Sequence, residues 1–241
     1  WGRYRWLGWS DLMHSIRTGE SAVGVGRAKI GMRQLDNERG AASVFNRAMT
    51  EISRMVARGV LRSVDFSRAR TVVDVGGGWG ELIAAVLGSH PHLRGILLDR
   101  PHAVEGARER LRRGDVLDRC DIVAGDFFEA VPAGGDVHLL KSIVHDWDDE
   151  ATARLLRRCR EAIADDGRIL VVEQVMPERV VGRAHLRQAI ADLNMLVMLG
   201  GRERKLSEYA ELLAASGLRL SRHLPTRAGA PDILEATLEG T

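Results

Sequence analysis

A short glycine-rich segment has the composition of a ligand-binding turn. After Asp74 every second residue is a glycine, at Gly76, Gly78 and Gly80. Glycines let the backbone approach a ligand closely in the turn that follows a strand. A dinucleotide-binding turn would place its third glycine at position 81, where a pyrophosphate meets the start of a helix, but Glu81 stands there. The segment therefore predicts a ligand without a phosphate, and a glycine-rich turn that binds nothing is the alternative.

Further polar residues follow the next apolar runs, at places that suit a nucleoside. Asp99 ends the second run, where a carboxylate can accept hydrogen bonds from both ribose hydroxyls. Asp126 and Phe127 follow the third run and offer an acceptor for an adenine amino group and a face for its ring. Lys141 ends the fourth run and is a candidate for the adenine side. Alone, Asp126 could simply initiate a loop and Lys141 could be a solvated strand end; together with the glycine segment they predict a nucleoside site.

His145 follows the fourth apolar run and is the candidate general base. An unperturbed histidine has a pKa of about 6.5, so its ring can accept a proton near neutral pH. Such a base typically contributes about 10²–10⁴-fold to a rate. A histidine that merely caps the strand is the alternative, and the HDWDDE context favours the base.

Three acidic residues after His145 invite a metal-site interpretation. Asp148 has the side chain of a helix N-cap, and Asp149 and Glu150 would lie in the first helical turn, where the helix dipole favours carboxylates. Because the helix start explains all three acids, we predict no metal.

The elements that position these residues alternate between strand and helix from residue 71 onward. Strand-like runs cover residues 71–75, 95–98, 121–124, 137–144 and 167–175, and helical patterns cover residues 81–87, 103–111, 149–164 and 207–215. The last two runs, 218–224 and 232–238, have no helix between them and predict a hairpin. The pattern predicts an α/β fold with a doubly wound, mostly parallel sheet and one antiparallel strand in the C-terminal hairpin.

Residues 1–70 contain no convincing strand, and their apolar side chains recur at helical spacing. We therefore predict two parts: a small helical region over residues 1–70 and a sheet domain over residues 71–241. Residues 21–40 are rich in glycine and arginine and have weak periodicity.

The composition of the 241 residues excludes several classes of protein. The chain has 35 basic and 33 acidic residues, a net charge of +2, and no basic stripe interleaved with aromatics, so we expect no nucleic-acid partner. No apolar run approaches the ~18 residues of a membrane span, and no signal peptide is visible. Cys120 and Cys159 are far apart and in no metal or redox spacing, which fits a cytoplasmic protein.

The pattern from residue 41 onward resembles the small-molecule O-methyltransferases, which include the plant caffeate and acetylserotonin types and bacterial enzymes that tailor aromatic antibiotics. The resemblance rests on the ordered segments VVDVGGGWG, ILLDRPHAV, GDFFEAVPAGGD, LLKSIVHDWDDE, GRILVVEQVMP and DLNMLVMLGGRER. It implies a class I methyltransferase fold with a Rossmann-like sheet, S-adenosylmethionine as methyl donor, S-adenosylhomocysteine as product and no metal.

The same resemblance implies roles for three residues. It makes His145 the general base, and it makes Glu173 in VVEQVMP and Glu203 in GGRER the carboxylates that orient the histidine. A carboxylate on one imidazole nitrogen fixes the tautomer and raises the basicity of the ring. For Glu203 the alternative is an ion pair with Arg202 or Arg204.

The acceptor pocket should be apolar with a few polar groups, and methionines adapt to varied aromatic ligands. Two helical stretches supply candidate lining residues, although such a stripe could equally be plain core. The candidates are Phe45, Met49, Asn194, Met195 and Met198. Residues 21–40 depart from the aromatic-rich pattern of bacterial members, which leaves the acceptor open.

The first twenty residues resemble the stretch that joins an N-terminal winged-helix dimerisation domain to the core in bacterial members. The sequence lacks that domain, so we expect exposed apolar surface on the first helices and a weakened homodimer.

The sequence thus predicts an O-methyltransferase that acts on a hydroxyl of a small aromatic secondary metabolite. One alternative is a relative that binds the cofactor but has drifted to hydroxylation or decarboxylation, or has lost activity. An NAD-dependent oxidoreductase shares the fold class but conflicts with Gly80 and Glu81.

Overall fold

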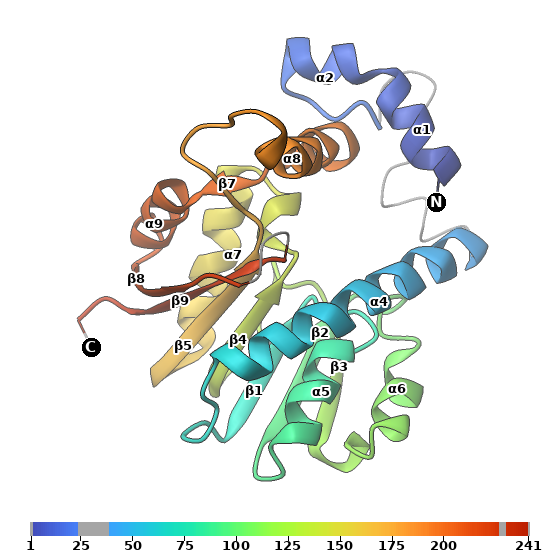
Figure 1. The fold of residues 1–241 in the computed structure, drawn as a ribbon. Coiled ribbons are helices and arrows are strands. Elements are labelled where there is room, and N and C mark those ends of the chain that lie inside the picture. The colour runs from blue at the N-terminus through green and yellow to red at the C-terminus, as the bar shows by residue number, and fades with distance from the viewer. Residues whose placement is uncertain (1, 24–38, 227–229, 241) are drawn as a thin grey trace.

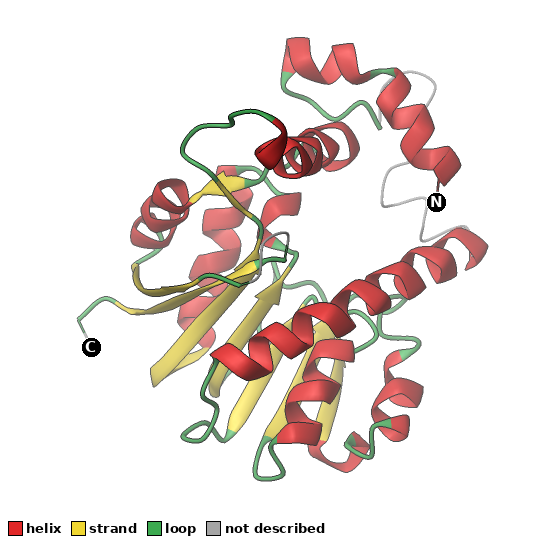
Figure 2. Cartoon of the chain, viewed as in Figure 1, coloured by secondary structure: helices red, strands yellow, loops and turns green. Residues whose placement is uncertain are grey.

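The computed structural model describes residues 2–23, 39–226 and 230–240, whose helices and strands are shown in Figure 1 and Figure 2. These residues form a seven-stranded sheet in the order β3-β2-β1-β4-β5-β9-β8. Its strands are β1 (Thr71–Val75), β2 (Arg94–Asp99), β3 (Cys120–Ala124), β4 (Gly135–Lys141), β5 (Ile163–Glu173), β8 (Leu218–Leu224) and β9 (Asp232–Leu238). The first five strands pair in parallel, and β9 pairs antiparallel with both β5 and β8. The predicted sheet and its hairpin are confirmed.

Each face of the sheet is covered by helices, as the alternation of strand side chains requires. In β1, Val72 packs into a core with α4 (Arg39–Ser63), α5 (Glu81–Ser89) and α6 (Ala107–Arg113), whereas Val73 packs on the opposite face. That opposite core includes α7 (Asp149–Ala162) and α9 (Leu206–Ala215). Figure 1 shows α4 crossing the near face of the sheet. Because α4 lies before residue 70 and shares a core with the sheet, the two predicted parts of the chain pack together. Their division at residue 70 stays a prediction.

Several predicted boundaries differ from the structure, and the strand predicted over residues 167–175 spans Ile163–Glu173. The helix predicted from residue 103 begins at Ala107; the residues before it form turns, and Gly106 packs closely against the Trp79 ring. The strand predicted to reach residue 144 ends at Lys141, and a 3₁₀ turn, η2 (Val144–Asp146), follows. The helix predicted to residue 164 ends two residues earlier, because β5 already begins at Ile163, which pairs with Gly135.

A second, smaller assembly lies beyond the carboxyl ends of the strands. β6 (Val175–Met176) pairs in parallel with β7 (Arg204–Lys205), and α8 (Leu186–Leu199) lies between them in sequence. Two further 3₁₀ turns, η1 (Leu117–Arg119) and η3 (Arg183–His185), precede β3 and α8. The short β6–β7 pair places the residues after β5 beside those after α8.

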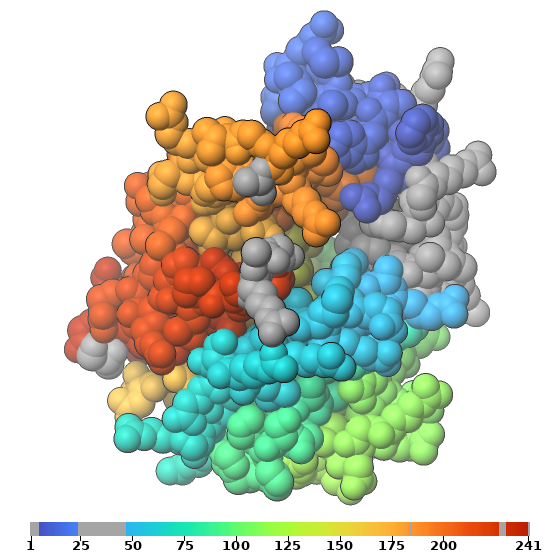
Figure 3. All heavy atoms as spheres, in the orientation of Figure 1, coloured from blue at the N-terminus to red at the C-terminus, as the bar shows by residue number. Residues whose placement is uncertain are grey.

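The N-terminal helices pack on α8 rather than on the large sheet. α1 (Gly2–Ser10) and α2 (Leu12–Thr18) contact α8 through a small apolar cluster that includes Val23, Val197 and Met198. Figure 3 shows the N-terminal atoms against those of the α8 region. Trp6 is 78% exposed, and Met13 and Ile16 are also exposed, which confirms the expected apolar surface on these helices. The weakened homodimer stays a prediction.

Across the described residues, no helix combines the length and the apolar character that crossing a membrane would require.

A buried histidine makes the stability of the fold sensitive to acid. His138 in β4 is 0% exposed, both of its ring nitrogens have no hydrogen-bond partner among the described residues, and burial lowers its pKa to about 4. Below about pH 6.5 this histidine is protonated in the unfolded chain, whereas in the folded chain it becomes protonated only near pH 4. The free energy of unfolding must therefore decrease over that window.

We expect His138→Leu to remove this decrease. Between about pH 7 and pH 4.5, wild type should lose on the order of 2–3 kcal/mol more unfolding free energy than the variant. Urea denaturation at the two pH values measures the difference. Equal losses in both proteins would contradict the prediction.

Candidate active site

The glycine segment forms a tight loop between β1 and α5. Gly76, Gly78 and Gly80 all have positive φ, at 72°, 57° and 76°, a conformation that side-chain-bearing residues rarely adopt. The Gly76 amide donates to the Leu98 carbonyl at 2.7 Å, which ties the loop to the end of β2. A Cβ on Gly78 would meet nothing within 4 Å. A hydrogen bond to the end of β2 thus fixes the loop, and the space beside Gly78 is open, as a ligand-binding loop requires.

The two acids assigned to the cofactor lie at different depths. The Oδ2 atom of Asp99 accepts from the Gly78 amide at 2.8 Å, at the open side of the loop, and burial raises the pKa of this carboxyl. Asp74 is 1% exposed and lies beneath the loop, where a Cβ on Gly77 would be 2.5 Å from its Oδ2 atom. Burial raises the pKa of Asp74 to about 7, against the opposing charge of Lys141. Asp74 therefore shapes the loop, and its contact with a ligand stays a prediction.

The remaining nucleoside candidates also surround the loop. Asp126 accepts from the Phe128 amide at 2.8 Å, so it does initiate a loop, and its contact with adenine stays a prediction. Phe127 lies beside the glycines, since a Cβ on Gly76 would be 3.6 Å from its ring. Lys141 is partly buried: burial lowers its pKa, and the charges of Asp74, Glu173 and Asp146 oppose that decrease. Its partial burial and its interaction with these three charges show that it is not a fully solvated strand end.

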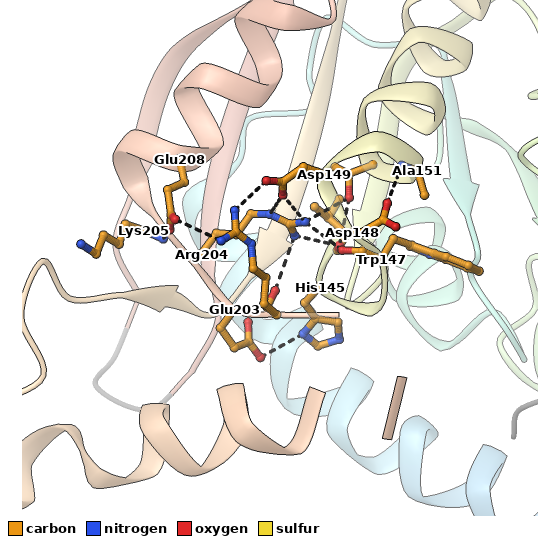
Figure 4. A network of polar contacts seen from close by, with 12 residues as sticks. His145, Trp147, Asp148, Asp149, Ala151, Glu203, Arg204, Lys205 and Glu208 are labelled. Atoms are coloured by element: carbon orange, nitrogen blue, oxygen red, sulfur yellow. Dashed lines mark hydrogen bonds and ion pairs between the residues drawn. The ribbon is translucent and has the colours of Figure 1, made fainter. Parts of the chain in front are cut away.

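His145 lies in η2 with two carboxylates on one ring nitrogen. Its Nδ1 atom is 3.0 Å from Glu203 Oε1 (Figure 4) and 3.2 Å from Glu173 Oε2, whereas its Nε2 atom lies 3.4 Å from Asp146 Oδ1. The side chain of His145 is 16% exposed. Both glutamates therefore face Nδ1, and the Asp146 carboxylate faces Nε2.

The charges around His145 strongly favour its protonated form. Burial alone would lower the pKa of His145, but the charges of Glu173 and Asp146 and the hydrogen bond to Glu203 outweigh burial and raise it to about 10. Burial raises the pKa of Glu173, against the opposing charge of His145. The site thus holds a histidine that is more basic than a free one.

The fold explains how Glu173 reaches this position. Glu173 ends β5, is 1% exposed, and its Oε1 atom accepts from the amides of Ile143 and Val144, at 2.8 Å each. These bonds draw the chain out of β4 and into η2, which is why the strand stops before the predicted residue 144. The same carboxylate therefore positions the backbone of the turn and contacts the ring of His145.

Glu203 reaches the ring through the β6–β7 pair. Val175 pairs with Arg204, so the residues that follow Glu173 and Glu203 lie side by side. The alternative that Glu203 pairs with Arg202 or Arg204 is wrong, because both arginines bind Asp149, at 2.7 Å and 2.8 Å. The Asp148 side chain accepts from the Ala151 amide, which confirms that it is a helix N-cap.

Three residues near His145 were not predicted from the sequence to belong to the active site. Arg204 is 0% exposed, although an arginine in GGRER has the pattern of a surface loop. A Cβ on Gly201 would lie 2.6 Å from the backbone carbon of Asp146, and Trp147 packs edge-on against Phe128 at 4.7 Å. No local signal distinguishes Arg204 or Gly201, because their partners lie more than 50 residues away in sequence.

The proposed acceptor residues are only partly brought together. Asn194 accepts from Arg5 at 2.9 Å and from Trp9 at 3.2 Å, so its oxygen binds α1. Met198 is 9% exposed within the α1–α8 cluster, which favours the packing alternative for this residue. Met49 and Met195 are partly buried. The side chain of Phe45 and residues 24–38 lie outside the described residues, so the pocket stays a prediction.

The cluster around His145 also has the dimensions of a metal site. One atom each of His145, Glu173 and Glu203 can be chosen so that all three lie within 4.8 Å of one another. A proton on Nδ1 that hydrogen-bonds to Glu203 would compete with a metal for this nitrogen, because a metal requires an unprotonated nitrogen. The absence of a metal stays a prediction.

The open glycine loop follows β1 and the basic histidine follows β4, its neighbour in a mostly parallel sheet with helices on both faces, where doubly wound folds bind their ligands. Comparison with known proteins gives the family. Residues 9–219 match the model of the O-methyltransferase domain, and the chain belongs to that family.

Its relatives include bacterial enzymes of antibiotic biosynthesis. The chain is 44% identical over 232 residues to the mitomycin biosynthesis 6-O-methyltransferase of Streptomyces lavendulae, covering 96% of this chain and 65% of that protein. It is 42% identical to a phenazine O-methyltransferase of Lysobacter antibioticus, covering 98% of this chain and 68% of that one. The chain thus spans about two thirds of the length of these relatives.

Solved structures agree with this assignment. The structure of a mitomycin 7-O-methyltransferase superposes with a TM-score of 0.91 at 45% identity, covering 98% of this chain and 68% of that one. An O-methyltransferase of neocarzinostatin biosynthesis, solved with S-adenosyl-L-homocysteine and 1,4-dihydroxy-2-naphthoic acid, superposes with a TM-score of 0.88 at 34% identity, covering 98% and 70%. The predicted class I methyltransferase fold is confirmed.

Proposed function

We propose that this chain is the catalytic part of a cytoplasmic enzyme that transfers a methyl group from S-adenosylmethionine to a hydroxyl of a small aromatic acceptor in antibiotic biosynthesis. One observation carries the proposal: two carboxylates face His145 at Nδ1, and its Nε2 atom, which lies 3.4 Å from Asp146, would accept the proton once the ring is deprotonated. By their names, two relatives in this family are an O-methyltransferase of mitomycin biosynthesis and a phenazine O-methyltransferase.

The residues around the glycine loop fit S-adenosylmethionine. The open backbone at Gly78 leaves room for a nucleoside, and Asp99 stands beside it as an acceptor for ribose hydroxyls. The Glu81 carboxylate is bound by Arg54 and Arg110, at the helix start where a pyrophosphate would otherwise bind. This arrangement supports a nucleoside ligand without a pyrophosphate.

When bound, S-adenosylmethionine would supply an electrophilic methyl group: the bond from the acceptor oxygen to the methyl carbon would form in line as the carbon–sulfur bond breaks, and S-adenosylhomocysteine would leave. The protein must align the acceptor hydroxyl and remove its proton. In our proposal His145 Nε2 accepts that proton, and Glu203 and Glu173 hold the Nδ1–H group and stabilise the resulting imidazolium. Alignment of the reactants can lower the activation barrier by up to ~7–11 kcal/mol in well-oriented systems. The fixed position of His145 therefore matters as well as its basicity.

Calorimetric titration with S-adenosylmethionine and with NAD tests the ligand, and methyl transfer to a panel of phenols tests the reaction. We expect binding of S-adenosylmethionine alone and turnover that EDTA does not change. Binding of NAD would contradict the proposal. Tight binding of S-adenosylmethionine without turnover on any phenol would instead support a relative that has lost the transfer reaction, and inhibition by EDTA would support a metal at the His145 cluster.

The charges around His145 predict a specific pH dependence. Because protonated imidazole cannot accept a proton, kcat/KM for the acceptor should rise with pH, with a midpoint well above the ordinary 6.5. Glu203→Gln removes a negative charge that favours imidazolium, so the midpoint should move to lower pH while the plateau rate decreases. Profiles of both proteins between about pH 6 and pH 10 measure the shift.

Glu150→Gln is the matched control, since Glu150 is an exposed acid in the first turn of α7. Its midpoint should equal that of wild type. An unchanged midpoint in Glu203→Gln would show that Glu203 does not set the basicity of His145.

A further inference from the structure

Arg204 is a fully buried cation that faces the back of the His145 turn. Its guanidinium donates to the Val144 carbonyl at 3.0 Å, to the Trp147 carbonyl at 2.8 Å and to Asp149 Oδ1 at 3.0 Å and 2.8 Å. Figure 4 shows these contacts converging on one side chain. Val144 and Trp147 bracket His145 and Asp146, so one arginine binds the backbone on both sides of the proposed base.

We infer that Arg204 is a positioning residue for His145, because it fastens the turn that carries the histidine to the segment that carries Glu203. The inference rests on the proposed function, in which His145 accepts the acceptor proton.

The turn η2 is held from two opposite sides. Glu173 accepts from the amides of Ile143 and Val144, and Arg204 donates to the carbonyls of Val144 and Trp147. A 3₁₀ turn of three residues makes too few internal hydrogen bonds to fix its own orientation. The orientation of the His145 ring is therefore set by these two charged side chains.

Residues 201–204, which lead into β7, meet the same turn at three points. Glu203 Oε1 contacts the ring at 3.0 Å, the Arg204 guanidinium binds the flanking carbonyls, and Gly201 packs so closely that a Cβ would lie 2.6 Å from the Asp146 backbone. Because Glu203 and Arg204 are consecutive, loss of the guanidinium contacts would free Glu203 from the ring as well.

The guanidinium is suited to this task and an ammonium is not. Arginine presents five N–H donors in a planar fork, so it can bind two carbonyls and a carboxylate at once in fixed directions. Asp149 anchors the fork, and its other oxygen binds Arg202 at 2.7 Å. Lysine would retain the positive charge but could not reproduce the fork.

Arg204→Lys tests the inference, and Arg202→Lys is the matched control. Arg202 binds the same Asp149 but is 44% exposed, and its guanidinium is separate from the carbonyl contacts that hold the turn. We expect Arg204→Lys to lower kcat by about 10- to 100-fold, as misplacement of a reacting group by about 1 Å can do, with unchanged KM for the acceptor and unchanged affinity for S-adenosylmethionine. The control should keep the wild-type kcat.

A second readout does not require activity. The ring of His145 faces Glu173 from β5, Glu203 before β7 and Asp146 in η2, with Lys141 of β4 behind these acids. Nuclear magnetic resonance of the ring, assigned by comparison with His145→Gln, should give a lower titration midpoint in Arg204→Lys than in wild type, because Glu203 moves away.

If Arg204→Lys fails to fold, Asp149→Asn replaces it, since this half-exposed partner can change without opening the core. We then expect the same shift of the His145 titration and a smaller decrease in kcat. Wild-type kcat together with a wild-type His145 titration, in whichever of the two variants folds, would overturn the inference. Absence of methyl transfer in wild type would instead contradict the proposed function, and the resonance measurement would still decide the role of Arg204.

Discussion

Replacing His145 with glutamine is expected to lower kcat for methyl transfer by about 10²–10⁴-fold, the usual contribution of a general base. Glutamine keeps a polar side chain near Glu203 but cannot accept a proton from a hydroxyl at neutral pH. Because the glycine loop and Asp99 lie at other strand ends, the affinity for S-adenosylmethionine should remain unchanged. Single-turnover rates with a phenol acceptor and calorimetry with S-adenosylmethionine measure the two quantities separately.

His223→Gln is the control, because this histidine lies in β8 and pairs with Asp232 in the C-terminal hairpin. It should retain wild-type rates. Equal rates in wild type and His145→Gln would remove His145 as the base and would direct attention to another proton acceptor.

Replacing Gly201 with alanine is expected to reduce kcat by about 100-fold, because the new Cβ must displace the backbone of the catalytic turn. The Cβ would lie 2.6 Å from the Asp146 carbon and 2.8 Å from the Asp146 oxygen, and these backbone atoms cannot rotate away as a side chain can. The melting temperature should decrease as well, since the contact lies where Arg204 and Glu203 also meet the turn. Steady-state kinetics and thermal denaturation test both effects.

Gly88→Ala is the matched substitution. Gly88 lies in α5, and a Cβ there would meet nothing within 4 Å, so activity should be unchanged and stability equal or slightly higher. Wild-type kcat in Gly201→Ala would show that the turn tolerates displacement.

The parts of the fold that depend on local pattern could be predicted from the sequence. The hairpin runs 218–224 and 232–238 coincide with β8 and β9, because Gly217 ends the preceding helix and no helical pattern separates the two runs. Strand ends that depend on distant residues could not be predicted. β4 ends at Lys141 because the Glu173 carboxylate at the end of β5 accepts hydrogen bonds from the amides of Ile143 and Val144. No property of residues 137–144 predicts that contact.

The same distinction applies to the site. Asp99 and His145 could be found because parallel strands bring their carboxyl ends to one edge of a sheet, so the order of the residues predicts their proximity. Arg204 could not be found, because the burial of its charge depends on Asp149, 55 residues earlier. Charged residues are normally exposed, and only the folded chain shows the pairing that permits this exception.

Glu81 limits how this loop could change over evolutionary time. Its carboxylate binds Arg54 of α4 and Arg110 of α6, so one residue joins two helices at the start of α5. A substitution to glycine would bring the segment closer to a dinucleotide fingerprint, yet it would leave Arg110, which is 24% exposed, without its carboxylate. A single mutation toward NAD binding would thus weaken the fold before it offered any new ligand. The methyl-donor specificity that we propose for this loop is therefore protected by a cost in stability that every intermediate sequence would have to bear.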